Sequence, residues 1–556
     1  MPLRPDGATL AGMKLALALA ASVFAAAPSA LGAGPDPSLL GIGFICSAEQ
    51  SGGSSGGAIM PGVGNGGARA DTANPEAQAW FENALDLYHA FSHDETKAAF
   101  AKAAALDPGC ALCAWGVAMS LGPTLNTQMT DAERVEALAV ADRAATLVKP
   151  GDTRTAGLIA TLQGRYSREP AAGGREMAYG KSLDALLAKN PGDAMIANLA
   201  AHALITPARQ DDYSGVPRAI AILEDVLARK PDDTAAIHYY IHATEFAQKA
   251  ALALPYAVRL DELAPGASHL VHMGTHTLMR VGRYEEVAVT NAQALKVDAE
   301  TRSALGASAR PLTQRYYTHN YLFGLGGALM AGDGPLAVKY ADHAAVAYPA
   351  SAPEERRTMA QARSLVALGR YAPRRALAVA DDPTAPRLVR LYRLYARGEA
   401  LASRRDAAGV AREARAVAAL SAEAAKAGET GNVTLATIME GVLRGRAAML
   451  AGRPAEAARH YDRAADTQEA AFPVPRNFDP PPWWYPVRRS VAAAELKAGR
   501  RAEAAAAARA SLAEWPHDPL ALRVLAQADA KGAAANRAEA RKVWQGDLAR
   551  VTLDLT

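Results

Sequence analysis

Cysteine and phenylalanine are scarce in this chain, and neither sign of charge is in excess. The 556 residues include three cysteines and nine phenylalanines, so the sequence cannot build a disulfide framework. Lys and Arg total 60 against 57 Asp and Glu, which gives a formal net charge of +3. This balance gives no basis for expecting nucleic acid or an anionic membrane as a partner. After Ala27, no apolar run is long enough to span a bilayer.

The N-terminus has the pattern of a secretory signal. Lys14 precedes an apolar run from Leu15 to Ala27, and small residues follow it up to Ala33. We therefore expect residues 1–33 to be a signal peptide and the protein to be periplasmic or secreted; an uncleaved anchor is the alternative. Residues 34–74 contain Gly- and Ser-rich stretches typical of a flexible, disordered linker.

Two of the three cysteines are close in sequence. Cys110 and Cys113 form a C-x2-C motif at the expected start of a helix. A helix N-terminus lowers a thiol pKa, so a redox pair or a local disulfide is one interpretation. Two small buried residues on a packed helix are the interpretation that the sequence favours, because a single C-x2-C is a weak signal.

The abundant residue is alanine, which has the highest helix propensity, and regular stops divide the chain into helix pairs. Trp80, Phe100, Ala103 and Pro108 match the tetratricopeptide (TPR) pattern, in which small and aromatic residues interlock two helices. The expected ends of second helices lie at Pro108, Pro150, Pro191, Pro231 and Pro265. This predicts an all-α, TPR-like solenoid of about eleven pairs in a right-handed superhelix. Its expected halves are residues 75–350 and 351–556.

Glycines mark the turns inside the expected pairs. The predicted turns contain Gly282, Gly369, Gly452 and Gly499, each followed by arginine. A glycine there can end the first helix in a left-handed conformation. In such a solenoid the first helix of each pair lines the concave face, and this rule determines where its side chains point.

Six of the twelve histidines lie on three consecutive first helices. Those on the first helix share one face with Glu245, at spacings of four and seven residues, and those on the second are spaced by three and seven. Because adjacent first helices lie roughly 10 Å apart, the imidazoles of facing stripes can meet. The six are His238, His242, His269, His272, His276 and His319.

This arrangement predicts a transition-metal site. Neutral imidazole is the commonest ligand for zinc, copper, iron and nickel, and six clustered histidines could hold one ion or two ions with three ligands each. Copper is the expected metal, with zinc or iron as alternatives. Glu245 could be a ligand, an orienting acceptor or a general base. The alternative without metal is an anion- or peptide-binding groove in which the histidines and Arg280 act as donors.

The other histidines and one aromatic cluster receive weaker interpretations. His202 could extend the site but is expected to be a lone packed residue. His89 and His93 flank a turn that is expected to break the helix, and they rank as outsiders that the superhelix could bring near the site. The expected solvated histidines are His343, His460 and His517. The run Trp483-Trp484-Tyr485 is expected to pack in the core, with substrate stacking as the alternative.

Several segments, in order over residues 75–530, resemble bacterial exported TPR proteins that are distantly similar to tetratricopeptide repeat protein 38. The resembling segments are His93-Asp-Glu95 with Phe100, Asp107-Pro-Gly-Cys110, His238-Tyr-Tyr-Ile-His242-Ala-Thr-Glu245, His269-Leu-Val-His272-Met-Gly-Thr-His276, Arg280-Val-Gly-Arg-Tyr284, Tyr317-Thr-His319-Asn320 and Pro481-Pro-Trp483-Trp-Tyr-Pro486. The family has proline where Gly274 stands, and it lacks a cysteine at Cys113. The resemblance implies the fold and a shared histidine site, and it does not supply a reaction.

Together these patterns indicate an exported metalloprotein. The most specific hypothesis is a copper-dependent oxidative enzyme acting on a peptide or small molecule in the concave groove, with Glu245 and Tyr317 as catalytic candidates. A peptide-binding scaffold without metal is the first alternative, because solenoids are usually binding scaffolds. A copper or zinc carrier without catalysis is the second. No nucleic acid and no membrane span after signal cleavage are expected.

Overall fold

The computed structural model describes residues 58–169, 174–304, 316–472 and 480–556. Within these ranges the chain forms α-helices and short 3-10 helices but no β-strand, as predicted. None of the described helices combines the length and the apolarity needed to cross a bilayer. The expected signal peptide, the first part of the expected linker and Cys46 lie outside the described residues.

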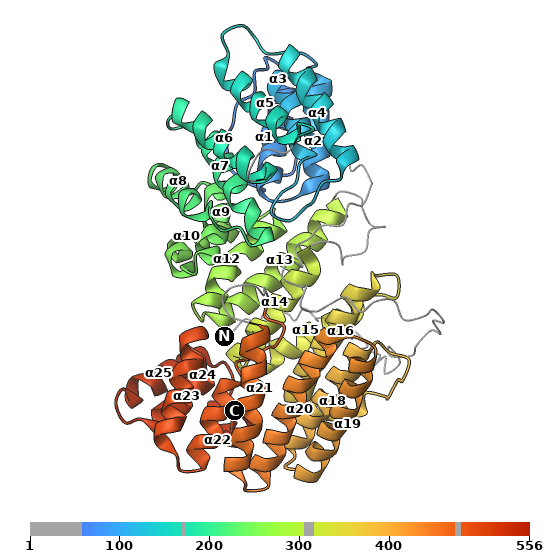
Figure 1. The fold of residues 1–556 in the computed structure, drawn as a ribbon, viewed down its shortest axis with the longest axis vertical. Coiled ribbons are helices and arrows are strands. Elements are labelled where there is room, and N and C mark those ends of the chain that lie inside the picture. Colours follow the sequence, from blue (N-terminus) through green and yellow to red (C-terminus); the bar gives the residue numbers. More distant parts are fainter. Residues whose placement is uncertain (1–57, 170–173, 305–315, 473–479) are drawn as a thin grey trace, which may run out of the picture.

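The helices alternate in direction along an elongated molecule (Figure 1). Its first part contains α1 Pro75–His89, α2 His93–Leu106, α3 Ala111–Ser120, α4 Asp131–Thr146, α5 Thr153–Tyr166, α6 Arg175–Lys189, α7 Ala194–Ile205 and α8 Val216–Arg229. The middle contains α9 Thr234–Phe246, α10 Leu254–Ala257, α11 Leu260–Leu263, α12 Ser268–Arg280, α13 Tyr284–Ala304, α14 Tyr316–Ala331 and α15 Gly334–Ala347. The last part contains α16 Glu354–Tyr371, α17 Pro373–Ala378, α18 Arg387–Ser403, α19 Ala407–Lys426, α20 Thr430–Leu450, α21 Pro454–Ala471, α22 Arg488–Lys497, α23 Arg501–Glu514, α24 Pro519–Ala528 and α25 Ala533–Val543.

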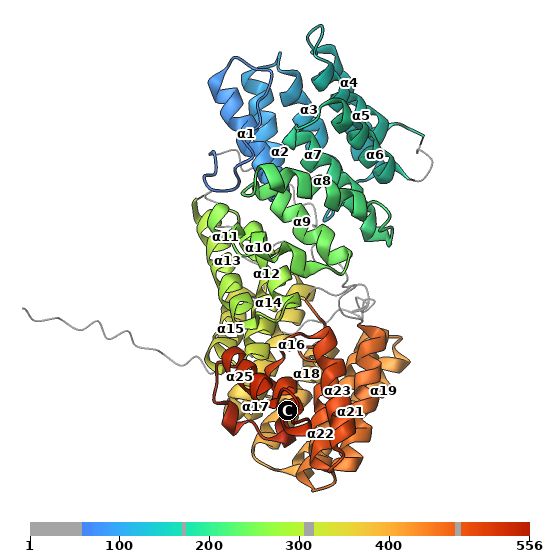
Figure 2. The ribbon, with the colours of Figure 1, turned by 90° about the vertical axis from the view of Figure 1, so that its left-hand side faces the viewer.

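Successive helices pack as antiparallel pairs, and the first helices of neighbouring pairs also touch. Thus α7 packs against α9, α9 against α12, α12 against α14, and α14 against α16. The turn from Figure 1 to Figure 2 shows the same succession of helices, from α1 at the top to the C-terminal helices at the bottom. The result is the TPR-like solenoid predicted from the sequence.

Side-chain caps and turn glycines set several of the helix ends. The Asp233 carboxylate caps α9 by accepting a hydrogen bond from the Ala236 amide at 2.9 Å. Gly282, Gly452 and Gly499 adopt positive φ angles of 76°, 74° and 82°, as expected for glycines that end helices.

The prediction for Gly369 was wrong. Helix α16 continues through this glycine to Tyr371, and Pro373 begins the next helix. A Cβ at Gly369 would lie 2.7 Å from the backbone of Ala396 on α18. Glycine is needed here for close helix packing and not for a turn.

The N-terminal part of the described chain is packed and not flexible, which differs from the linker expected through residue 74. Val63 is buried, and Asn65 donates from its side chain to the Asp232 carbonyl at 2.7 Å and accepts from the Thr234 amide at 3.0 Å. The Gly66 amide donates to the carboxylate of Asp86 on α1 at 3.0 Å. These contacts tie the segment to both α1 and the start of α9.

The last helices fold back on the middle of the chain. The hydroxyl of Tyr284, at the start of α13, donates to the Pro516 carbonyl at 2.8 Å, and the Gln545 amide donates to the carbonyl of Ala331 at the end of α14 at 2.8 Å. These contacts join residues more than 200 positions apart in sequence. The solenoid is therefore closed between its C-terminal end and its middle.

A disulfide bond joins Cys110 and Cys113, whereas the sequence favoured two unlinked buried residues. Cys110 is the N-cap of α3 and Cys113 lies one turn later, so the two side chains share a face. Nearby, the Asp71 carboxylate accepts hydrogen bonds from the Ala111 and Leu112 amides at 3.0 and 2.9 Å.

Two large apolar cores fill the molecule, and they meet in its middle. The N-terminal core extends from Val63 to Met273 and Tyr316, and the C-terminal core begins at Leu278 and Tyr317. Helices α12 and α14 contribute to both cores. The polar side chains at this junction are those of the predicted histidine site.

Candidate metal centre

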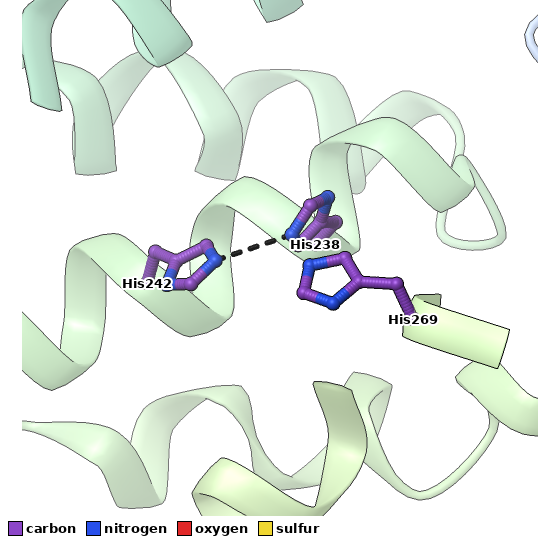
Figure 3. Close-up of side chains that lie close together, drawn as sticks. All are labelled: His238, His242 and His269. Carbon is purple, nitrogen blue, oxygen red and sulfur yellow. Dashed lines mark hydrogen bonds between the residues drawn. The ribbon is translucent and has the colours of Figure 1, made fainter. Parts of the chain in front are cut away.

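The first group of histidines lies between α9 and α12. His238 and His242 occupy successive turns of α9, and His269 reaches from the first turn of α12 towards them (Figure 3). One potential ligand atom from each residue lies within 4.8 Å of the other two, and all three side chains are buried. We call His238, His242 and His269 the first triad.

The second group lies between α12 and α14. His272 and His276 occupy successive turns of α12, and His319 comes from the first turn of α14. Their potential ligand atoms also lie within 4.8 Å of one another, and all three side chains are buried. We call His272, His276 and His319 the second triad. The structure thus divides the six predicted ligands into two sets of three.

The two triads are neighbours. The ring centroids of His242 and His276 are 5.8 Å apart, and those of His269 and His272 are 6.1 Å apart. The first of these contacts joins α9 to α12, and the second lies within α12, which carries ligands of both triads. The two triads therefore adjoin each other, and each could hold an ion of its own.

Hydrogen bonds at Nδ1 fix the orientation of three of the rings. His238 Nδ1 donates to the carbonyl of His89 at 2.6 Å, and His276 Nδ1 donates to the Glu245 carboxylate at 3.0 Å. His272 Nδ1 donates to Asn291 Oδ1 at 2.6 Å. The Asn291 amide is oriented in turn, because its Nδ2 donates to the Val287 carbonyl at 2.8 Å. With the proton on Nδ1, each neutral ring presents the lone pair of Nε2.

These lone pairs face one another at ligand-like distances. Nε2 of His276 is 2.9 Å from Nε2 of His272 and 3.3 Å from Nε2 of His319, and the Nε2 atoms of His238 and His242 are 3.2 Å apart. Two nitrogens bound to one ion at about 2.0–2.1 Å in a tetrahedral arrangement are about 3.3 Å apart. His272 and His276 have both committed their single proton to Nδ1, so a shared cation satisfies this contact better than a hydrogen bond.

The ring of His269 independently indicates a bound cation. Both of its ring nitrogens are buried, and neither has a hydrogen-bond partner among the described residues. Buried polar atoms are rarely left unpaired, because desolvation without a partner costs roughly 1–3 kcal/mol. An ion bound by the first triad would give one of these nitrogens its missing partner.

Burial favours the neutral form of five of the six rings. Desolvation lowers the pKa of His238 to about 3, and it lowers the pKa values of His242, His269, His272 and His319 well below the usual range for histidine. Neighbouring imidazoles lower these pKa values further, since two protonated rings would repel each other. Neutral imidazole is the form that binds a metal.

Two phenylalanine rings pack against the triads, and neither was identified as a site residue from the sequence. Phe91 lies in the turn between α1 and α2 with φ of 56°, and its ring centroid is 4.6 Å from His238 and 5.4 Å from His269. Phe323 on α14 lies 5.0 Å from His272 and 4.8 Å from His276. Both phenylalanine rings are fully buried. They exclude water from the imidazoles and form apolar walls around the centre.

Three histidines outside the triads are closer to the site than expected. His89 supplies the carbonyl that His238 contacts, and its own Nδ1 hydrogen-bonds the Tyr239 hydroxyl at 2.8 Å. His202 stacks on Tyr239 with ring centroids 4.7 Å apart, and His93 stacks on Phe91 at 5.8 Å. The superhelix brings His89 and His93 near the site, as the sequence analysis allowed, because α1 contacts α9.

The two catalytic candidates have different positions. Glu245 lies beside the second triad, where its carboxylate accepts hydrogen bonds from His276 and from Arg280 Nε, the latter at 2.9 Å. His276 and Arg280 hold the pKa of this carboxyl well below its usual range despite burial. Its position is that of an orienting acceptor. Tyr317 instead hydrogen-bonds His343 and packs against Tyr348 in the C-terminal core. Tyrosine rings beside the first triad are those of Tyr316, 4.1 Å from His269, and Tyr239, 5.1 Å from His238.

The remaining sequence candidates lie away from the triads. His343 is not solvated as predicted: it is half-buried beside Tyr317, and burial lowers its pKa. His460 is paired with Glu456 at 3.8 Å, and His517 is exposed beside Glu539 at 2.9 Å. Trp483, Trp484 and Tyr485 are buried in the C-terminal core, as the packing interpretation predicted.

Comparison with known proteins finds no sequence relative and only remote structural likenesses. No protein-family model and no curated protein sequence matches the chain. A solved structure of Naa15/Naa10 bound to HypK-THB is similar over 84% of this chain and 71% of the other, with 14% identity and a TM-score of 0.22.

The human IFIT1 dimer with m7Gppp-AAAA is similar over 78% of this chain and 88% of the other, with 12% identity and a TM-score of 0.30. The P58(IPK) TPR domain is similar over 76% and 98%, with 11% identity and a TM-score of 0.20. At these identities and TM-scores the likenesses carry no argument about this chain. The chain is an all-helical, TPR-like solenoid with two adjacent histidine triads at its centre.

Proposed function

We propose that the two triads hold a pair of copper ions that bind and reduce dioxygen, and that the protein is a copper-dependent oxidase. The observation that supports this most directly is the pairing of two buried trihistidine sets whose unprotonated Nε2 atoms converge within each set. Three protein ligands leave at least one coordination position open on each ion. A closed structural site would use four ligands and would not need a second set alongside.

The charge balance of the centre favours copper over zinc. The triads contain no carboxylate, and the negative charge of Glu245 is already balanced by Arg280 at 2.9 Å. Two divalent ions would therefore bring four uncompensated positive charges into a buried region, and monovalent ions would halve that charge. Cu(I) is the monovalent ion that imidazole binds well.

The reaction that such a pair supports is oxidation by dioxygen. Copper held by the six histidines would supply redox chemistry, with dioxygen as the oxidant. Complete reduction of dioxygen to two waters takes four electrons and four protons, so two substrate molecules would each lose two electrons and two protons. Phe91 and Phe323 would protect the reduced oxygen from bulk water.

The direct test is the copper content of variants. The purified protein, loaded anaerobically with Cu(I), is expected to contain two copper ions per chain by elemental analysis. His242→Ala should retain the ion of the second triad, His272→Ala should retain that of the first, and the double variant should retain neither. Helicity measured by circular dichroism should not change.

A matched control and a spectrum sharpen the result. His460→Ala removes a histidine outside the centre and should leave both ions in place. After oxidation, two copper ions that share a bridging ligand couple their unpaired electrons, so the wild type should give little spin-resonance signal. His242→Ala should give the full signal of one isolated ion.

The outcomes separate the alternatives. A protein that binds neither copper nor zinc would overturn the proposal and leave a binding scaffold. A protein that binds two copper ions but consumes no oxygen with a reductant such as a catechol would be a carrier.

A further inference from the structure

A cavity continues the inner face of the solenoid beyond the second triad. It encloses about 430 Å³ of empty space, a figure that includes space open to solvent. Helices α12, α14 and α16 form its walls together with the segment after residue 480. The lining residues include Met279, Leu322, Gly326, Arg363, Trp484 and Trp515.

The cavity is next to the metal centre on the same two helices. Met279 follows His276 by three residues on α12, and Leu322 follows His319 by three on α14. Residues three apart lie on one helix face in adjacent turns. Phe323, which follows Leu322 on α14, contacts the imidazoles of the second triad. A molecule in the cavity is therefore about one helical turn from the second triad.

The lining indicates what kind of molecule fits. Methionine, leucine, proline and tryptophan side chains make the walls apolar, and two indole rings provide flat surfaces for a planar ligand. Arg363 is the single charged residue among those that line the cavity. Its Nη2 donates to the Pro481 carbonyl at 3.2 Å, and no carboxylate of the described chain forms an ion pair with it. A guanidinium with five N–H donors favours a carboxylate ligand.

Gly326 keeps the cavity open. Helix α14 has glycine at this position, and the nearest atom to an added Cβ is the terminal methyl of Met279 at 3.8 Å. Gly324 and Gly327 on the same helix differ, because an added Cβ there would clash with Tyr340 at 2.0 Å or with the Tyr284 backbone at 2.7 Å. Helix packing therefore requires those two glycines, whereas Gly326 faces free volume.

We propose that this cavity is the substrate site of the oxidase and that it takes a small aromatic carboxylate, such as a phenolic acid. The aromatic ring lies between the indole rings and Met279, and the carboxylate pairs with Arg363. This inference rests on the proposed function for its chemistry, but the binding that it predicts does not require bound copper.

The test measures binding of 3-(4-hydroxyphenyl)propionate by calorimetry to the protein as purified, with copper content determined on the same sample. The wild type should bind the acid more tightly than the corresponding amide by about tenfold, the contribution of one charge-assisted pair. Arg363→Gln should weaken binding of the acid to the level of the amide and leave the amide unchanged.

A second variant tests the volume separately from the charge. Gly326→Leu should fill the cavity and abolish binding of acid and amide alike. Gly164→Leu is the matched control, because Gly164 is an exposed helical glycine with no atom within 4 Å of an added Cβ. It should bind both probes like the wild type.

The two proposals fail in different ways. If the wild type does not bind the acid, or if Arg363→Gln and Gly326→Leu bind it as the wild type does, the cavity is not the substrate site, whatever the copper content. If no preparation contains or takes up copper while the binding pattern is as described, the site stands and the oxidase proposal fails.

Discussion

At the scale of single residues, the chemistry of the centre depends on which ring nitrogen carries the proton. In His238, His272 and His276 the acceptor beside Nδ1 is a carbonyl, an amide oxygen and a carboxylate respectively. Each acceptor comes from a different helix of the solenoid, and each turns Nε2 towards the centre. The residues that orient the ligands are therefore as much a part of the site as the ligands.

Glu245→Gln tests this orienting role. The amide can accept a hydrogen bond from His276 or from Arg280 but carries no charge to balance the guanidinium. We expect the copper affinity of the second triad to fall by about 10–100-fold, the usual effect of losing such a partner, while the first triad keeps its affinity. Competition with a Cu(I) chelator measures both affinities.

Glu456→Gln is the control for Glu245→Gln, since Glu456 also faces a histidine, His460, but lies far from the centre along the chain. It should leave both affinities unchanged. Equal loss from both triads in Glu245→Gln would argue against a local orienting role and for general destabilisation.

The sequence predicted all six triad residues but not their division into two sets. Helical spacing places His238 beside His242 and His272 beside His276, because both pairs are four residues apart. The assignment of His269 to the first triad depends on the crossing of α9 and α12, which spacing does not determine. Spacing also does not determine which of Tyr316 and Tyr317 faces the triads, since adjacent helical residues point about 100° apart and the rotation of α14 is set by packing.

At the scale of elements, most boundaries could be predicted because proline and glycine have local effects. The two exceptions have tertiary causes. Helix α16 passes through Gly369 because the backbone of α18 lies against it. The segment near residue 65 is packed because side chains of α1 and the backbone before α9 bind its polar groups, and a Gly- and Ser-rich composition does not reveal such partners.

Asp86→Asn measures how α1 holds this segment. Burial raises the pKa of Asp86 to about 6, so the folded state disfavours its ionised form. The resulting cost to folding is absent below the unfolded pKa near 3.8, grows as the pH rises, and is complete above about pH 6. An asparagine can still accept from the Gly66 amide without that cost.

We therefore expect Asp86→Asn to be more stable than the wild type at pH 7.5, by about 1–3 kcal/mol. The advantage should shrink at pH 5 and disappear towards pH 4. Urea unfolding at the three pH values measures it. An advantage that stays constant with pH would show that ionisation of Asp86 is not its cause.

At the scale of the whole molecule, the solenoid departs from a simple one-dimensional array. In such an array each repeat touches only its neighbours, and unfolding can begin at either end. Here the turn after α12 touches the chain between α23 and α24. A closed arrangement couples the metal centre, the cavity and the C-terminal repeats, because Trp484 and Trp515 of the last repeats complete the cavity wall.

Gly282→Ala tests the closure. Its φ of 76° disfavours alanine, and an added Cβ would lie 2.0 Å from the Pro516 carbonyl oxygen. Gly452→Ala is the matched control, with φ of 74° in an equivalent turn and no atom within 4 Å. Both variants carry the same backbone cost of about 1–2 kcal/mol.

Only Gly282→Ala also disturbs the long-range contact. We expect it to lose about 1–3 kcal/mol more stability than Gly452→Ala in urea unfolding, the usual cost of overpacking. Equal losses would indicate that the C-terminal repeats do not hold the middle of the chain.

The contacts that tie the segment near residue 65 and the C-terminal helices to the middle of the chain also limit how related sequences can change. Open repeat arrays lengthen or shorten by gain or loss of whole units, because a new unit needs only one neighbour. Here the segment near residue 65 must reach α9, and Gln545 must reach the end of α14. An inserted pair between these anchors would pull the contacts out of register, so we expect homologous chains to keep the number of helix pairs and to vary in the loops between them.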